Sequence, residues 1–339
     1  MCGIIGQINF KQQKTSTPSL HQIRHRGPDG QGEWTSSGGN VYFGHTRLAI
    51  IEPTPAGRQP MHDSKEEFTI TFNGEIYNHL SLRNLLPHVT WRSTSDTETL
   101  VELLAAKGVQ ALPLLKGMFA FALHNRLDNS VLLVRDRLGI KPLWFKHTED
   151  SFSFCSEIRP LLTPGKATFQ KQALSEYIAF GRMPGDGEII DGIESFSPGS
   201  WMKVFPNGTI EKGKWWPSSS IAAFTKSSKP DAVKRVRELV TTAVEEHLIS
   251  DVGVGAFLSG GIDSSVVTLL AGKVLGKRLK TFTVGFPQTA FDERKIARLV
   301  AAKAGSEHVE LEVKESDCLE WVKEAVLSLD MPSVDAINT

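Results

Sequence analysis

Short runs of alternating hydrophobic and polar residues dominate the first part of the chain. Positions 68–72 alternate between Phe or Ile and Thr and then reach Asn73-Gly74, a pattern typical of a strand that ends in a turn. Runs 118–123 and 131–134 flank the polar stretch 125–129, which predicts a hairpin. Two further strands are predicted, at 152–155 and at 201–205.

Two helices are predicted among these strands. Residues 96–107 and 171–180 are followed by Gly108 and Gly181, and glycine can adopt the left-handed conformation that ends a helix. We therefore predict a sheet-rich α+β domain over residues 2–214. The polar stretch that follows, 215–230, is interpreted as a linker.

Longer strands alternate with helices beyond residue 230. The first helix, 231–248, carries Val233, Val236, Val240 and Val244 on one face. Strands are predicted at 252–258, 279–285 and 308–313, and helices at 264–275, 293–304 and 317–329. This alternation is typical of parallel βαβ units, so we predict an α/β domain with a doubly wound parallel sheet over residues 231–339.

Composition narrows the class of protein. The 339 residues suffice for about two domains. Lys plus Arg and Asp plus Glu both number 38, which gives no electrostatic reason to expect nucleic acid or an anionic membrane as partner. No apolar run approaches the roughly 20 residues of a membrane span, and no secretion signal is recognisable. Cys2, Cys155 and Cys318 are too scattered for a disulfide framework or a metal cluster. These features predict a cytoplasmic protein.

Cys2 is the first candidate for chemistry because it directly follows the initiator methionine. Removal of Met1 would leave Cys2 with a free α-amine, whose reference pKa of about 7.7–8.0 suits it to accept the thiol proton. Nucleophile and base then belong to one residue. Gly3 and Gly6 would let the backbone approach a substrate closely. On its own, a cysteine at this position is weak evidence, because an incidental residue near a frayed terminus is the more common explanation.

Several ordered motifs favour the chemical interpretation. They are MCGIIG at 1–6, HRGPD at 25–29, GHTRLAI at 44–50, NGEIYN at 73–78, SD at 95–96, GMFAF at 117–121, RDRLGIKPL at 135–143 and SE at 156–157. Together they resemble the glutamine amidotransferase domain of the N-terminal-nucleophile hydrolases, in particular that of glutamine-hydrolysing asparagine synthetases of the B type. The resemblance spans the first domain and implies a layered N-terminal-nucleophile hydrolase fold.

The chemistry of glutamine gives these motifs roles. Free glutamine is a zwitterion, so Arg47 suits its carboxylate and Asp96 its ammonium. Attack on the side-chain amide builds a negative oxygen, to which the Asn73 side chain and the Gly74 backbone N–H can donate. Glu75 is then placed to orient the substrate. The resemblance implies the same roles and adds Leu48 and Ile51 to the glutamine-binding residues.

Each of these residues also has an ordinary structural explanation. Arg47 could form a surface salt bridge, Asn73-Gly74 a plain hairpin turn, and Asp96 a helix N-cap. The segment 25–29 could be a lid or a structural turn, and His25 has no specific catalytic task.

A second motif, FLSGGIDSS at 257–265, follows a predicted strand and opens a helix. Small residues there free backbone N–H groups to surround an anion at the positive end of the helix. No Gly-Lys-Ser/Thr closes the loop, so it is not a Walker A motif. It resembles the loop of ATP pyrophosphatases, and a tight structural connection is the alternative.

The resemblance assigns ATP and Mg²⁺ to this loop. It implies phosphate contacts from Ser259, Gly260, Gly261, Ser264 and Ser265, a Mg²⁺ contact from Asp263, and backbone contacts to adenine from Leu258 and Val284.

Asparagine synthetases normally continue past the equivalent of Thr339 with a second Ser-Gly-x-Gly-Ser-Asp-type loop and a helical region. No second loop of that kind occurs in the sequence, so we expect a C-terminally truncated synthetase domain. The leading hypothesis is glutamine-dependent asparagine synthesis, with glutamine, aspartate and ATP as substrates and AMP and pyrophosphate as products. The alternatives are a glutaminase alone, a non-catalytic remnant, or a ligase that acts on another carboxylate. The oligomeric state stays open, with a homodimer as one option.

Overall fold

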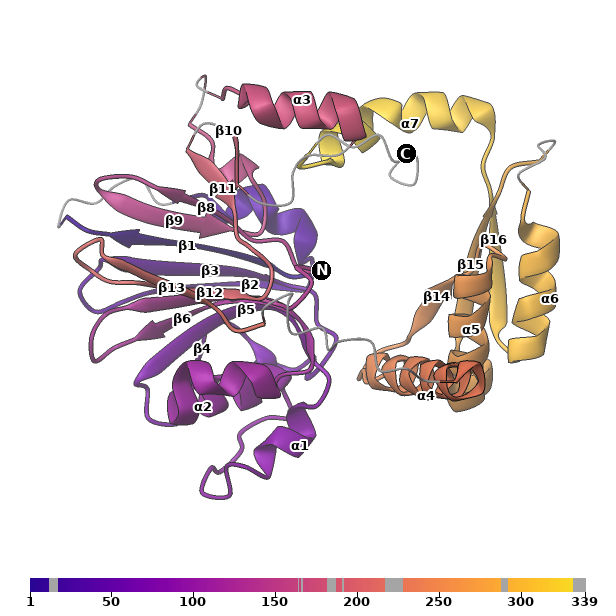
Figure 1. The fold of residues 1–339 in the computed structure, drawn as a ribbon, viewed down its shortest axis with the longest axis horizontal. Coiled ribbons are helices and arrows are strands. Elements are labelled where there is room, and N and C mark those ends of the chain that lie inside the picture. Colours follow the sequence, from indigo (N-terminus) through magenta and orange to yellow (C-terminus); the bar gives the residue numbers. More distant parts are fainter. Residues whose placement is uncertain are drawn as a thin grey trace. The chain divides into compact units, whose positions relative to one another are not determined.

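Two antiparallel sheets form the framework of the first part of the chain (Figure 1). The computed structural model describes residues 1–11, 18–163, 165, 167–181, 187–190, 192–216, 228–287 and 292–331. The chain divides into one unit of Met1–Ile221 with Leu329–Ala336 and a second unit of Ala222–Ser328 with Ile337–Thr339.

The strands of the first unit form two sheets. The first sheet has the order β10 (Gly187–Ile190), β11 (Ile193–Ser195), β8 (Trp144–His147), β9 (Ser151–Cys155), β1 (Gly3–Asn9), β3 (Val41–Arg47), β2 (Gly30–Thr35). The second has the order β13 (Ile210–Lys214), β12 (Ser200–Val204), β7 (Val131–Arg135), β6 (Gly117–Asn125), β5 (Phe68–Ile76), β4 (Met61–His62). The helical segments are η1 (Leu20–Arg26), η2 (Pro55–Gly57), α1 (His79–Arg83), α2 (Asp96–Lys107), η3 (Gly108–Leu114), η4 (Arg159–Leu161) and α3 (Lys171–Phe180).

The core of this unit lies on both sides of each sheet. Ile4 of β1 packs with Leu133 of the other sheet, in a cluster that joins the two sheets. Ile5 points to the opposite face of β1 and packs with Ile23 of η1. Leu104 of α2 belongs to a third cluster on the outer face of the second sheet. The unit therefore has helical segments outside two stacked sheets, the layered α+β architecture expected for it (Figure 1).

Most local elements of the first unit agree with the sequence pattern. The hairpin forms from β6 and β7, which pair antiparallel. Both predicted helices have the expected bounds, and Gly181 ends α3 in the left-handed conformation at φ +69°. Trp215, at the start of the expected linker, stacks on Phe119 and donates its indole N–H to Arg135 O at 3.1 Å. The first unit therefore continues through this tryptophan; residues 217–227 of the expected linker lie outside the described residues.

The predicted turn at Asn73-Gly74 is wrong. Strand β5 continues to Ile76, and Asn73 and Gly74 pair with Ala120 and Phe119 of β6. A Cβ atom on Gly74 would lie 2.3 Å from Met118 O, so glycine is required here by the close approach of β6. Tertiary pairing overrides the local turn signal.

The second unit contains a parallel sheet in the order β14 (Gly255–Phe257), β15 (Lys280–Gly285), β16 (Glu307–Glu312). Its helices are α4 (Lys229–His247), α5 (Ile262–Leu275), α6 (Arg294–Ala304) and α7 (Glu315–Ser328), with η6 (Gly276–Arg278) between α5 and β15. The alternation of parallel strands and helices agrees with the predicted α/β class.

Several apolar residues of the predicted strands and helices in this unit are exposed. The first strand covers only Gly255–Phe257 of the predicted 252–258, and Phe257 is 86% exposed. Along β15, Thr281 and Thr283 are buried while Phe282 and Val284 are partly exposed, so one face of this strand is covered among the described residues. On α4, Val244 is buried but Val233 and Val236 are more than half exposed. None of the described helices has the length and hydropathy needed to cross a membrane.

Candidate active site

Cys2 lies at the entry to β1, in the middle of the first sheet, and is half-buried. Its Sγ is 3.4 Å from Leu48 N, which donates to it, and 3.5 Å from Leu48 O, which accepts its S–H. Burial raises the pKa of the Cys2 thiol, and the hydrogen bond from Leu48 opposes that rise. Leu48 therefore contacts the candidate nucleophile through its backbone.

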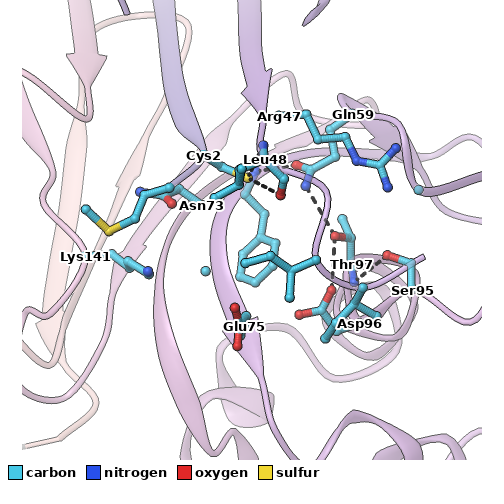
Figure 2. A pocket seen from close by; sticks show the side chains of 16 residues that line it. Cys2, Arg47, Leu48, Gln59, Asn73, Glu75, Ser95, Asp96, Thr97 and Lys141 are labelled. Atoms are coloured by element: carbon cyan, nitrogen blue, oxygen red, sulfur yellow. Dashed lines mark hydrogen bonds between the residues drawn. The ribbon is translucent and has the colours of Figure 1, made fainter. Parts of the chain in front are cut away.

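A cavity opens beside Cys2 (Figure 2). It is lined by Met1, Cys2, Arg47, Leu48, Ile50, Ile51, Gly57, Gln59, Phe72, Asn73, Gly74, Glu75, Ser95, Asp96, Thr97 and Lys141. Every glutamine-site residue predicted from the sequence is in this set, although they come from four separate segments of the chain. Their individual roles stay predictions.

The edge of β5 faces this cavity. The Phe72 N–H donates to Gln59 Oε1 at 2.7 Å, and the Ile76 N–H donates to Asp96 Oδ2 at 3.0 Å. Backbone N–H groups alternate in direction along a strand, so the Gly74 N–H lies between these two on the same edge. Phe119, which pairs with Gly74, uses both backbone groups on Asp136 instead. The Gly74 N–H is therefore directed toward the cavity.

Asn73 adds a second donor beside it. The residue is 1% exposed, and its Nδ2 is buried with no hydrogen-bond partner in the described part of the chain. An unpaired buried donor costs about 1–3 kcal/mol, so native structures seldom retain one without a reason. A ligand oxygen in the cavity would supply the missing acceptor.

The two charged residues expected to bind a zwitterion are held by their own neighbours. Arg47, the last residue of β3, donates from Nη1 to Thr54 O at 2.9 Å and from Nη2 to Glu52 O. Burial lowers the pKa of the guanidinium, which stays charged in any ordinary range. The loop carbonyls orient Arg47 and leave part of its donor set for a ligand.

Asp96 is the first residue of α2, and the N-cap is Ser95, whose hydroxyl accepts from Thr97 N at 3.1 Å. The alternative that Asp96 caps the helix is therefore wrong. Burial raises the pKa of Asp96 to about 6, against the opposing hydrogen bonds from Ile76 and Thr97. Near neutral pH its carboxylate is an anion at the positive end of α2.

Gln59, Thr97 and Lys141 line the cavity but were not predicted from the sequence. Gln59 joins β5 to α2, since its Nε2 also donates to Thr97 Oγ1 at 3.3 Å. No local pattern around Gln59 points to this contact. Lys141 does stand inside the RDRLGIKPL motif, so that motif carried a signal for it.

The HRGPD segment positions Cys2. Arg26 Nε donates to Cys2 O at 3.0 Å, and Arg26 Nη1 lies 3.0 Å from Glu157 Oε1. His25 Nε2 lies 2.7 Å from the same carboxylate oxygen. Asp29 accepts from Ala49 N at 2.8 Å, next to Leu48. The segment is therefore a structural support around the nucleophile, and His25 acts through Glu157.

The second predicted site stands at the start of α5. Gly260 has φ +80°, which favours glycine, and Gly261 N donates to Ser259 Oγ at 3.4 Å. Ser259 Oγ and Ser264 Oγ are 3.1 Å apart, and Ser265 Oγ is buried with no hydrogen-bond partner among the described residues. This small-residue turn at a helix N-terminus fits a phosphate group.

The other predicted ATP contacts have mixed geometry. Leu258 already donates its N–H to Phe282 O at 2.8 Å and accepts the Thr283 hydroxyl at its carbonyl, so its N–H is not offered to a base. Val284 lies in β15, paired with Leu311 of β16. Asp263 is exposed in the first turn of α5. The described residues contain no group of three or more metal-ligating side chains.

Comparisons with known proteins fit this arrangement. Residues 1–216 match the family described as glutamine amidotransferase domain, and residues 235–339 match the family described as asparagine synthase. Asparagine synthetase [glutamine-hydrolyzing] 1 of Bacillus subtilis is 34% identical over 99% of this chain and 54% of its own length. Asparagine synthetase [glutamine-hydrolyzing] 3 of the same organism is 32% identical over 100% of this chain and 58% of its own. Asparagine synthetase [glutamine-hydrolyzing] 3 of Arabidopsis thaliana is 31% identical over 100% of this chain and 55% of its own length. The chain thus spans about half the length of the curated relatives it matches.

Proposed function

Because the chain belongs to the glutamine amidotransferase family, we propose that its first unit hydrolyses glutamine to glutamate and ammonia, with Cys2 as nucleophile. The observation that carries this proposal is the Asn73 Nδ2, which has no partner among the described residues, beside the Gly74 N–H on the wall of the cavity that contains the thiol. Two donors directed to one place next to a nucleophile are what a developing oxyanion requires.

The reaction begins with the α-amine that removal of Met1 exposes. The thiol proton passes from Sγ to this amine, and the thiolate attacks the side-chain amide carbon of glutamine. The carbonyl oxygen becomes an oxyanion that accepts hydrogen bonds from Asn73 Nδ2 and the Gly74 N–H. Collapse breaks the carbon–nitrogen bond, and the ammonium returns its proton to the departing nitrogen, which leaves as ammonia. Water then adds to the thioester, and breakage of the carbon–sulfur bond releases glutamate and the free thiol.

The charges around the cavity suit the rest of the substrate. The Arg47 guanidinium would pair with the α-carboxylate of glutamine, and the Asp96 carboxylate with its α-ammonium. Glu75 adds a second anion on the cavity wall. Fixed charges on both sides of the cavity favour a free amino acid over a neutral amide.

The test is an assay of ammonia and glutamate release from glutamine by the purified chain. Intact-protein mass should show the loss of Met1. Cys2→Ala should abolish ammonia release, because the nucleophile is gone. Cys155→Ala is the matched control: Cys155 is a fully buried cysteine that is not among the residues lining the cavity. Wild-type activity in Cys2→Ala would show that the nucleophile is assigned wrongly.

The second unit supports a further part of the proposal. We propose that it binds ATP at the turn before α5 and uses the ammonia to convert aspartate to asparagine, with AMP and pyrophosphate as the other products. The match of residues 235–339 to the asparagine synthase family supports this, and so does the Ser265 hydroxyl, which has no partner within the described ranges. ATP would supply the adenylate that activates the carboxylate. Asp263 would contact the accompanying Mg²⁺, a hard cation that prefers carboxylate oxygen.

An assay with glutamine, aspartate, ATP and Mg²⁺ separates the remaining functions. Asparagine and pyrophosphate in equal amounts support the ligase. Glutamate and ammonia without pyrophosphate support a glutaminase alone. Pyrophosphate that depends on a carboxylic acid other than aspartate identifies a related ligase.

A further inference from the structure

Lys141 is a buried cation in the wall of the cavity around Cys2. It is only 6% exposed, and it lies in the loop between β7 and β8. Figure 2 shows its side chain among those that line the cavity, together with Cys2 and Glu75. Burying an ammonium group is expensive, so a lysine in such a place needs an anion nearby or a task.

The loop holds Lys141 firmly in position. The Asp136 carboxylate accepts the backbone N–H groups of Leu138, Ile140 and Lys141, each at 3.0 Å. Arg135 Nε donates to Lys141 O at 2.8 Å. Both backbone polar groups of Lys141 are thus satisfied inside the loop. The side chain therefore projects from a rigid support, as a residue with an electrostatic task requires.

Charged groups from several helices, strands and loops act on Lys141 and on the Cys2 thiol. The groups that act on the Lys141 ammonium are the anions Glu75 and Asp136, the Cys2 thiol and the cation Arg26. Those that act on the Cys2 thiol are the α-amine of Met1, present before processing, and the side chains of Asp96 and Lys141. Asp96 opposes ionisation of the thiol, whereas the α-ammonium and Lys141 favour it.

We propose that Lys141 is a positioning residue for the glutaminase reaction, whose fixed positive charge favours the Cys2 thiolate and the free-base form of the α-amine. The inference rests on the proposed function of Cys2 and assigns a charge that this mechanism leaves unused.

Burial and a neighbouring positive charge have opposite effects on the ionisation of the Cys2 thiol. Burial raises the pKa of Cys2, which would leave little thiolate at neutral pH. A nearby cation favours the thiolate. It also keeps the amine in its free-base form before the transfer, although it disfavours the ammonium that the transfer produces. Before processing, burial lowers the pKa of the Met1 α-amine at this place, and the charges of Arg26 and Lys141 lower it further.

The experiment measures the reactivity of Cys2 without any substrate. The full chain with Met1 removed is treated with iodoacetamide over a range of pH, and alkylation at Cys2 is followed by peptide mass. In Lys141→Met the midpoint should rise by about 1 pH unit, the lower end of the effect of a neighbouring charge. Lys141→Arg retains the charge and should keep the midpoint near that of the wild type. Lys146→Met, on neighbouring β8, is the control and should leave the midpoint unchanged, because Lys146 Nζ binds Thr163 Oγ1 at 3.0 Å and Lys146 does not line the cavity.

The outcomes distinguish a role of the Lys141 charge from other roles of this residue. An unchanged midpoint in folded Lys141→Met overturns the inference, and so does an equal shift in Lys141→Arg. A rise in the KM for glutamine with no change in alkylation also overturns it, since Lys141 would then bind substrate. If Lys141→Met does not fold, Lys141→Gln replaces it: removal of the cation should raise the midpoint in the same way, and no change counts against the inference. Cys2→Ala keeps the two proposals separate, because ammonia release by that variant would refute the nucleophile itself, whatever Lys141 does.

Discussion

Replacement of Asn73 by alanine should damage catalysis while leaving stability almost unchanged. Loss of one oxyanion donor lowers kcat by about 10²–10³-fold. The folded protein loses no hydrogen bond from Nδ2, because that atom has no partner among the described residues. Relief of an unpaired buried donor is worth about 1–3 kcal/mol, and it opposes a packing loss of similar size. The unfolding midpoint should therefore stay within about 4 °C of the wild type, the effect of about 1 kcal/mol in a unit of this size.

Asn78 offers the matched control. Its Nδ2 donates to Leu114 O and its Oδ1 accepts from Lys116 N, both at 3.0 Å. Asn78→Ala loses both bonds at a half-buried site, about 1–2 kcal/mol, so its midpoint should fall by about 2–8 °C while kcat stays near that of the wild type. Steady-state glutaminase kinetics and thermal unfolding measure the two effects. The reasoning is refuted if Asn73→Ala changes only KM, or if it unfolds earlier than Asn78→Ala with its kcat intact.

Three further predictions concern the charges and the phosphate turn. Arg47→Ala and Asp96→Asn should each raise the KM for glutamine more than tenfold, because each removes a charged partner of the zwitterion, and an unchanged KM in either variant contradicts its assignment. Burial raises the pKa of Asp96 to about 6, so its carboxylate is charged above that pH and becomes neutral below it. The KM should accordingly rise as pH falls through about 6, by up to tenfold per unit, and the same titration of Asp96→Asn should be flat. Gly260→Ala should weaken ATP binding in calorimetry at least tenfold, since φ is +80° there, whereas Gly253→Ala, outside the turn and with open space around its Cα, should bind ATP normally.

Local sequence patterns correctly predicted those helices and strands that are specified by residues close to them in the sequence. Helix α2 begins and ends as predicted because Ser95 caps it and Gly108 follows its last residue. The hairpin of β6 and β7 forms because the two runs are close in the sequence. The valines on one face of α4 are buried only in part, because periodicity identifies an apolar face but not what covers it.

The sequence also indicated which residues meet at the first cavity, because an N-terminal cysteine and a set of ordered motifs pointed to them. What the motifs could not show is which polar groups are already satisfied. Asn73-Gly74 has the local signal of a turn, yet pairing with β6 makes it a strand that directs one donor to the cavity. Asp96 resembles a cap, yet Ser95 caps the helix and burial determines the pKa of Asp96.

The sequence by itself therefore determined the helices, the hairpin, the alternation of strands and helices in the second unit, and most of the residues proposed to carry the glutaminase reaction. Only the tertiary structure decided that Gln59 and Lys141 join them and that Asn73 and Gly74 line the same cavity as the thiol. The reason is physical. Periodicity and capping depend on residues a few positions apart, whereas burial, hydrogen-bond pairing and the field at Cys2 depend on segments that meet only after the two sheets have stacked.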